Sequence, residues 1–270
     1  MTVVVAWREG QGGLLWVVSD SRLSDGDVDR RRVLTDHGAK VMEIPVVVYS
    51  STGFVDVPHY RTTFGLSFAG SSLIAMQAYA TALPLWSRLA TRDTALPTLD
   101  DLADHFALIL ARYAKGLGAA GLVPRCACLL VGYDPSTERS RAKSLVVSSV
   151  DGSVSIAEAC VEDEVFEVLG RNPEKVRANI HTFPKSARMP FETDGRKALR
   201  YIRDTLRNPD DLEIGGGVQI GICSVRGFEP CFDAPSLTGE SPFPNMRFRG
   251  LEFEEISRVG PTFVNLRGIG

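Results

Sequence analysis

Residues 1–22, "MTVVVAWREGQGGLLWVVSDSR", determine how the fold begins. Two apolar segments, 2–7 and 14–19, flank the Gly-rich "EGQGG", and this pattern predicts a β-hairpin. The first strand begins at Thr2, directly behind the initiator methionine, although chain ends usually fray unless something holds them. We therefore expect this N-terminus either to be an ordinary first strand or to carry the function.

Composition and charge restrict the kind of protein. The 270 residues are 44% hydrophobic and 23% charged, with a net charge of −3, which suits a soluble chain with one full core. The balanced charge argues against a nucleic-acid partner, and no segment has the roughly 20 apolar residues that cross a membrane. Five cysteines without paired CxxC spacing predict reduced thiols and a cytoplasmic location. The four histidines share no spacing, so we expect no metal.

The apolar pattern predicts the remaining elements. We expect further strands at 40–49, 64–69, 127–133, 143–149, 153–159, 215–225 and 228–232, and helices at 71–91, 98–116, 162–169, 173–181 and 194–207. Antiparallel hairpins with helices grouped between them indicate an α+β fold. We expect one domain over 1–235 and a C-terminal extension over 236–270, to which the pattern assigns no structure.

The chemistry of an N-terminal threonine makes Thr2 a candidate nucleophile. Once Met1 is removed, Thr2 carries both a hydroxyl and a free amine, whose pKa of about 7.7–8.0 lets it accept a proton near neutrality. Such a residue also needs nearby cations and hydrogen-bond donors. The candidates are Asp20 and Arg22 in "SDSR", Lys40 in "GAKVMEI", and the amides of "AGSS" at 69–72.

In this order, these elements resemble the proteasome β-subunit family and its bacterial homologues, which are N-terminal-nucleophile (Ntn) hydrolases. The resemblance covers about residues 2–135 and rests on Thr2, Asp20-Ser21-Arg22, Lys40 followed by alternating apolar residues, and Phe68-Ala69-Gly70 before the first long helix. It implies a four-layer α/β/β/α sandwich and a threonine-type peptidase without a cofactor. It also implies a homo-oligomeric ring that cleaves peptides or unfolded proteins, with an unfoldase as a possible partner.

The resemblance also implies a role for individual residues. Thr2 would be the nucleophile with its own amine as base, Lys40 would stabilise developing negative charge, and Asp20 would position Lys40. The amide of Gly70 would line the oxyanion hole, and Asp211 in "DDLEIGG" would support the nucleophile. The pocket for the residue before the scissile bond would be bordered by three side chains, Leu23, Ser24 and Phe68, and would prefer apolar residues.

Two positions differ from the family pattern and leave other functions open. Arg171 and Ile214 stand where the family has serines that support the terminal amine. The chain could therefore be a catalytically inactive ring scaffold. The same nucleophile chemistry also serves Ntn amidohydrolases that act on small amides, which is a third possibility. We expect the tail and the long connection at 50–63 to contribute contacts between subunits.

Overall fold

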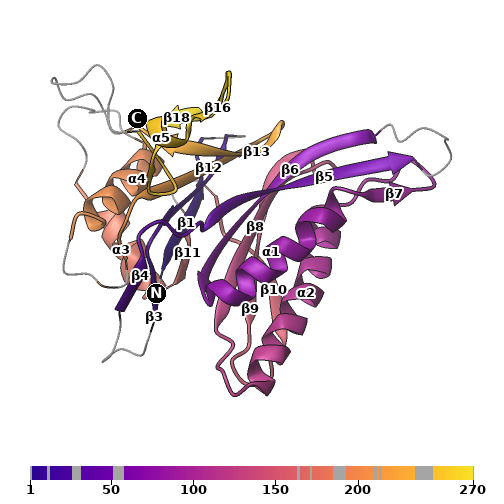
Figure 1. Cartoon of the computed structure of the whole chain (residues 1–270), viewed down its shortest axis with the longest axis horizontal. Coiled ribbons are helices and arrows are strands. Elements are labelled where there is room, and N and C mark those ends of the chain that lie inside the picture. The colour runs from indigo at the N-terminus through magenta and orange to yellow at the C-terminus, as the bar shows by residue number, and fades with distance from the viewer. Residues whose placement is uncertain are drawn as a thin grey trace.

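The computed structural model describes residues 2–10, 13–25, 32–50, 58–162, 165–170, 172–184, 193–208, 212, 214–234 and 246–269. Two large sheets face one another, and helices lie along their outer sides (Figure 1). The helices are α1 (Ser72–Trp86), α2 (Leu99–Ala119), α3 (Pro173–Thr182), α4 (Asp194–Thr205) and the short α5 (Phe253–Ile256).

The first sheet has eight strands and contains the N-terminal hairpin. Its order is β11-β1-β2-β12-β13-β14-β15, with β18 pairing β13. These strands are β1 (Val3–Arg8), β2 (Leu15–Asp20), β11 (Glu167–Gly170), β12 (Val218–Ser224), β13 (Gly227–Asp233), β14 (Arg247–Phe248), β15 (Leu251–Glu252) and β18 (Arg267–Ile269). Strands β1 and β2 pair antiparallel with Val5 opposite Val18, which confirms the predicted hairpin.

The second sheet has six strands in the order β10-β9-β8-β6-β5-β7. They are β5 (Val41–Ser50), β6 (Pro58–Gly70), β7 (Leu89–Thr91), β8 (Cys126–Asp134), β9 (Arg139–Val147) and β10 (Val154–Glu158). Two small two-stranded sheets complete the described chain: β3 (Leu23–Asp25) with β4 (Arg32–Thr35), and β16 (Arg258–Val259) with β17 (Thr262–Phe263).

Three buried clusters hold these layers together. Helices α1 and α2 pack on the six-stranded sheet around residues such as Phe64, Trp86 and Phe106. Helices α3 and α4 pack on β1, β2 and β12. The third cluster, which includes Val4 and Val17, fills the space between the sheets. Strand β1 is therefore buried on both faces, which is why its sequence is continuously apolar instead of alternating.

The expected fold class, α+β with a four-layer α/β/β/α sandwich, is wrong as a description of this chain. Strands make up 43% of the structure and helices 27%, so the molecule is mostly sheet. On the eight-stranded sheet the helices are short, with 10 residues in α3 and 12 in α4. That sheet continues past β12 and β13 into strands supplied by the C-terminal segment.

Several segments supply the additional strand content, among them β3, β4, the first part of β6 and the three that follow. The segment 162–169, expected to be helical, contributes β11, whose backbone pairs with β1. The helix expected over 71–91 ends at Trp86, and β7 follows it at the edge of the second sheet. The extension expected over 236–270 is not separate within its described part, because β14 and β18 both pair with β13. Residues 51–57 and 235–245 lie outside the described residues.

In the described part of the chain, no helix combines the length and apolar character needed to span a membrane.

Candidate active site

The N-terminal site lies at one end of the space between the two sheets. Strand β1 begins there, directly after Thr2, and β2 ends there at Asp20. From the facing sheet, β5 begins at the same end after Lys40, and β6 finishes there at Gly70. The sheet topology therefore gathers four of the five expected catalytic residues at one end of the molecule. The fifth, Asp211, lies outside the described residues, as does Arg171.

Asp20 and Lys40 form a buried ion pair at the centre of this site. The Lys40 Nζ lies 2.9 Å from the Asp20 Oδ1, and both side chains are fully buried. The same Oδ1 accepts a hydrogen bond from the Val3 amide at 3.2 Å. Asp20 therefore connects the ammonium group of Lys40 to the peptide bond that follows Thr2.

Burial shifts the pKa values of both partners. Desolvation raises the pKa of the Asp20 carboxyl above its ordinary value, and the neighbouring Lys40 opposes that shift. Desolvation lowers the pKa of Lys40, and Asp20 opposes that shift in turn. Perturbed groups of this kind concentrate at functional sites.

Backbone donors and one glutamine hold the ion pair in place. The Asp20 Oδ2 accepts from the amides of Arg22, at 3.1 Å, and Gly215, at 3.4 Å. The Gln219 Oε1 accepts from the Lys40 amide at 2.9 Å and the Val41 amide at 3.1 Å. Its Nε2 donates to the carbonyl of Asp20 at 3.3 Å. Gln219 thus ties the end of β2 to the beginning of β5.

The Arg22 side chain does not form its ion pair with Asp20, its neighbour in the motif. The Arg22 side chain instead binds Asp36 through two bonds, Nε to Oδ1 at 2.6 Å and Nη2 to Oδ2 at 3.1 Å. This ion pair lowers the pKa of Asp36. The hydroxyl of Ser21, the residue between Asp20 and Arg22, donates to the Asp36 carbonyl. The "SDSR" motif therefore fixes the loop that leads to Lys40.

Strand β11 contacts the backbone of Thr2 from the edge of β1 that faces away from β2. The side chain of Thr2 is buried, with 4% of its surface exposed. Because side chains alternate along a strand, Thr2 shares the inter-sheet face of Val4. Val3 pairs with Gly170 of β11, and a Cβ atom on Gly170 would lie 1.8 Å from the Thr2 carbonyl oxygen. This close backbone approach leaves no room for a side chain behind Thr2.

We expect Gly170→Ala to displace Thr2 and to destabilise the fold. The new methyl group would overlap the Thr2 carbonyl, and the φ of +111° is itself unfavourable for alanine. From the overlap and the unfavourable φ together, we expect the unfolding free energy to fall by about 2 kcal/mol or more, as measured by urea denaturation.

Gly121→Ala is the matched control for this prediction. Gly121 also has a positive φ, +78°, but a Cβ there meets no atom within 4 Å. Gly121→Ala therefore introduces the unfavourable φ without a steric overlap. Equal losses in the two variants would contradict a specific contact between Gly170 and Thr2.

Gly70 is required by the backbone at the end of β6. Its φ is +97°, and a Cβ atom there would lie 2.4 Å from the Arg125 carbonyl oxygen. That oxygen accepts a hydrogen bond from the Ser71 amide at 2.7 Å, so β8 and the start of α1 meet tightly here. This geometry explains the glycine on structural grounds alone. The role of the Gly70 amide in an oxyanion hole stays a prediction.

The three expected pocket residues are not brought together. Leu23 and Ser24 lie half-buried in β3, and Leu23 packs over Gly38 beside Lys40. Phe68 is fully buried in the cluster between the second sheet and its helices, on the face away from the first sheet. Leu23 and Ser24 therefore remain the candidates for a substrate-binding wall, and Phe68 acts as a core residue.

Sequence reasoning missed several residues that support this site. Gln219 could have been found, because it is the polar residue in the apolar stretch "VQIGICSV". The contribution of the C-terminal segment had no sequence signal. Arg249 Nη2 donates to the carbonyl of Val41 at 3.0 Å, and the Gly250 carbonyl lies 3.1 Å from the His37 Nδ1. The segment after β14 thus contacts the chain both before and after Lys40, at His37 and at Val41.

Within the described ranges, no three His, Cys, Asp or Glu side chains gather in a way that would hold a metal ion.

Comparison with known proteins gives a likeness in structure alone. No protein-family model matches the chain, and no curated protein sequence matches it. The Anbu complex from Pseudomonas aeruginosa, solved as a helical assembly, is similar with a TM-score of 0.50 and 17% identity, over 82% of this chain and 80% of that chain. Anbu (ancestral beta-subunit) from Yersinia bercovieri has a TM-score of 0.49 and 18% identity, over 82% and 80%. At these identities the comparison with the Pseudomonas protein shows the fold and nothing further.

The assignment to the proteasome β-subunit family, as a bacterial proteasome homologue, is therefore corrected. The similar Pseudomonas structure is an Anbu complex, no family model matches, and the chain is mostly sheet. The four short motifs that suggested the family instead mark the residues that the topology gathers at one end of the two sheets.

Proposed function

We propose that this chain is a hydrolase of peptide bonds that uses Thr2 as its nucleophile after removal of Met1. The observation that carries the proposal is the fully buried Asp20 carboxylate, which binds both the Lys40 ammonium and the amide next to Thr2. A cation is thereby fixed close to the N-terminal residue in a site shielded from water, where its charge acts strongly.

The reaction would proceed in two steps. The Thr2 hydroxyl attacks the carbonyl carbon, its proton passes to the terminal amine, and the amine returns that proton to the leaving nitrogen. Water then attacks the acyl-enzyme and releases the second product, which regenerates Thr2. Lys40 stabilises the negative charge that develops in both steps, and Asp20 keeps Lys40 in position. None of these steps uses a cofactor.

We further propose that the chain forms a homo-oligomer. The similar Pseudomonas protein was solved as a helical assembly, and light scattering together with electron microscopy would test for a ring or a helix here. Peptides or unfolded proteins are the proposed substrates, and an unfoldase is a proposed partner. The cysteines of the described chain are free, which fits the reducing cytoplasm.

A second candidate function is that of an inactive scaffold. It is favoured by Ile214, which is buried in the cluster under α3 and α4 where a serine was expected. A scaffold would keep the fold and the assembly and would have no need of a free N-terminal amine.

Intact mass spectrometry separates these two functions. The purified chain is weighed before and after treatment with an epoxyketone, which needs both the hydroxyl and the free amine of an N-terminal threonine. We expect the methionine mass to be missing and one adduct to form per chain. A chain that keeps Met1 and forms no adduct would contradict the hydrolase proposal and support the scaffold.

A further inference from the structure

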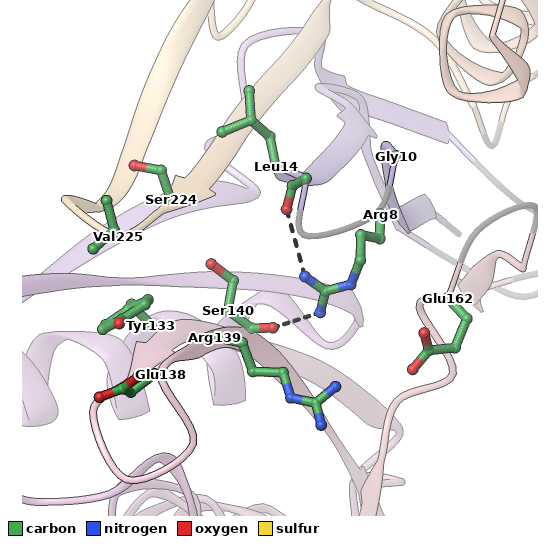
Figure 2. Close-up of a pocket in the computed structure, with 11 residues that line it drawn as sticks. Arg8, Gly10, Leu14, Tyr133, Glu138, Arg139, Ser140, Glu162, Ser224 and Val225 are labelled. Atoms are coloured by element: carbon green, nitrogen blue, oxygen red, sulfur yellow. Dashed lines mark hydrogen bonds between the residues drawn. The ribbon is translucent and has the colours of Figure 1, made fainter.

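A pocket lies at the end of the space between the sheets that is opposite to the Thr2 site. Its volume is about 730 Å³, within the range of about 300–1,000 Å³ that is usual for small-molecule sites. It is formed where β1 ends at Arg8, at the β8–β9 turn and at the β12–β13 turn (Figure 2). Arg8 lies six residues beyond Thr2 along β1, which is about 20 Å in an extended strand. This pocket is therefore distinct from the Thr2 site.

Arg8 is held at the wall of this pocket in a defined orientation. Its Nη2 donates to the Ser140 carbonyl at 2.5 Å, and its Nη1 reaches the Gly13 carbonyl at 3.5 Å. The side chain is half-buried. A guanidinium has five N–H donors, so these two bonds fix the group and leave donors for a ligand.

The other charged groups of the pocket are not paired with one another. Arg139, Glu138 and Glu162 line it and are exposed. Within the described chain, none of these three forms an ion pair with a residue of the pocket. Figure 2 shows the Arg139 guanidinium pointing in the direction of Glu162, whereas Glu138 lies beside Tyr133. The pocket thus offers separated positive and negative groups.

We propose that this pocket binds a small zwitterion, an amino acid or a short peptide with free ends. Two guanidinium groups suit a carboxylate, which accepts their paired N–H bonds, and Glu162 would receive the ammonium group. The apolar side chains of Leu14 and Val225 would contact the ligand side chain. The two glutamates would repel a polyanion such as a nucleotide, and the two arginines would repel a polycation. The proposal does not rest on hydrolysis at Thr2.

Calorimetric titration of the full chain with the dipeptide leucyl-glycine tests the proposal. We expect saturable binding, weakened about tenfold or more by N-acetylation or C-amidation of the dipeptide, because each change removes one charge-assisted contact. Arg139→Gln and Glu162→Gln should each weaken binding by a similar factor. Both side chains are exposed and neither has an ion-pair partner in the described chain, so these variants should fold normally.

Two control variants define the site further. Glu138→Gln removes an equivalent charge from the far side of the same pocket and should leave the affinity for leucyl-glycine unchanged. Thr2→Ala should also leave it unchanged, which separates this pocket from the proposed active site. The proposal is overturned by absence of saturable binding, by equal binding of the capped dipeptides, or by inorganic phosphate binding as well as leucyl-glycine.

Discussion

Replacing Thr2 by Ala is expected to abolish covalent labelling by an epoxyketone and to lower any peptidase activity by roughly 10³- to 10⁶-fold, as removal of a nucleophile does in other hydrolases. The reason is that alanine keeps the terminal amine, the strand and the buried Asp20–Lys40 pair, but lacks the attacking oxygen. The measurements are the adduct mass and the turnover of a panel of fluorogenic peptide amides with apolar residues before the scissile bond.

Thr2→Ser is the matched control, because serine keeps both the hydroxyl and the amine on the same residue. It should retain labelling and a measurable part of the activity. In the active chain, kcat/KM should rise as the pH increases through about 7.7–8.0, where an α-amine loses its proton and becomes able to act as a base. Labelling that persists in Thr2→Ala would place the nucleophile elsewhere and remove the basis of the proposed mechanism.

The order of strands and long helices could largely be predicted from the sequence, because their burial has a clear periodicity. The helix expected over 98–116 starts where it was predicted: Thr98 caps α2, and its side chain and that of Asp101 exchange hydrogen bonds with each other's backbone amides. In the first helix, Trp86 is fully buried, and Met76 and Tyr79 pack against the same cluster. The small residues Ala75 and Ala78 are fully buried there as well, which the spacing of large apolar side chains does not predict. Small residues let a helix approach a sheet closely, and hydrophobicity patterns give them little weight.

The remaining errors concern contacts between segments that are distant in sequence. Strand β11 is four residues long, and it forms because the edge of β1 is available for pairing, which no local pattern of 162–169 encodes. The C-terminal segment likewise gains its structure by pairing with β13. At the site, the structure contains the contact between Asp20 and Lys40 that the resemblance implies, and the catalytic roles of the two residues stay predictions. The ion pair between Arg22 and Asp36 was not predicted, because Asp36 lies in the loop after β4, where no pattern marks it.

Lys40→Met is expected to lower the unfolding free energy by about 3–5 kcal/mol at pH 7, measured by urea denaturation. Removing one partner of a buried ion pair leaves the other charge without compensation. A loss of this size in unfolding free energy is usual for such a change. Here the remaining charge is the fully buried Asp20 carboxylate, which keeps its hydrogen bonds from the amides of Val3, Arg22 and Gly215. Lys175→Met is the matched control. It makes the same change at an exposed position of α3, and its effect should stay within about 0.5 kcal/mol.

The pH dependence of this loss identifies its cause. In the native chain burial already raises the pKa of Asp20, and Lys40 opposes that shift, so removing Lys40 raises the folded-state pKa further. A carboxyl whose pKa is higher in the folded than in the unfolded state adds stability at pH values below its unfolded pKa. It loses that contribution as the pH rises through the folded value. The difference between Lys40→Met and the native chain should therefore shrink as the pH falls from 7 toward 4. A difference that is independent of pH would mean that lost packing of the lysine stem, and not the uncompensated charge of Asp20, causes the destabilisation.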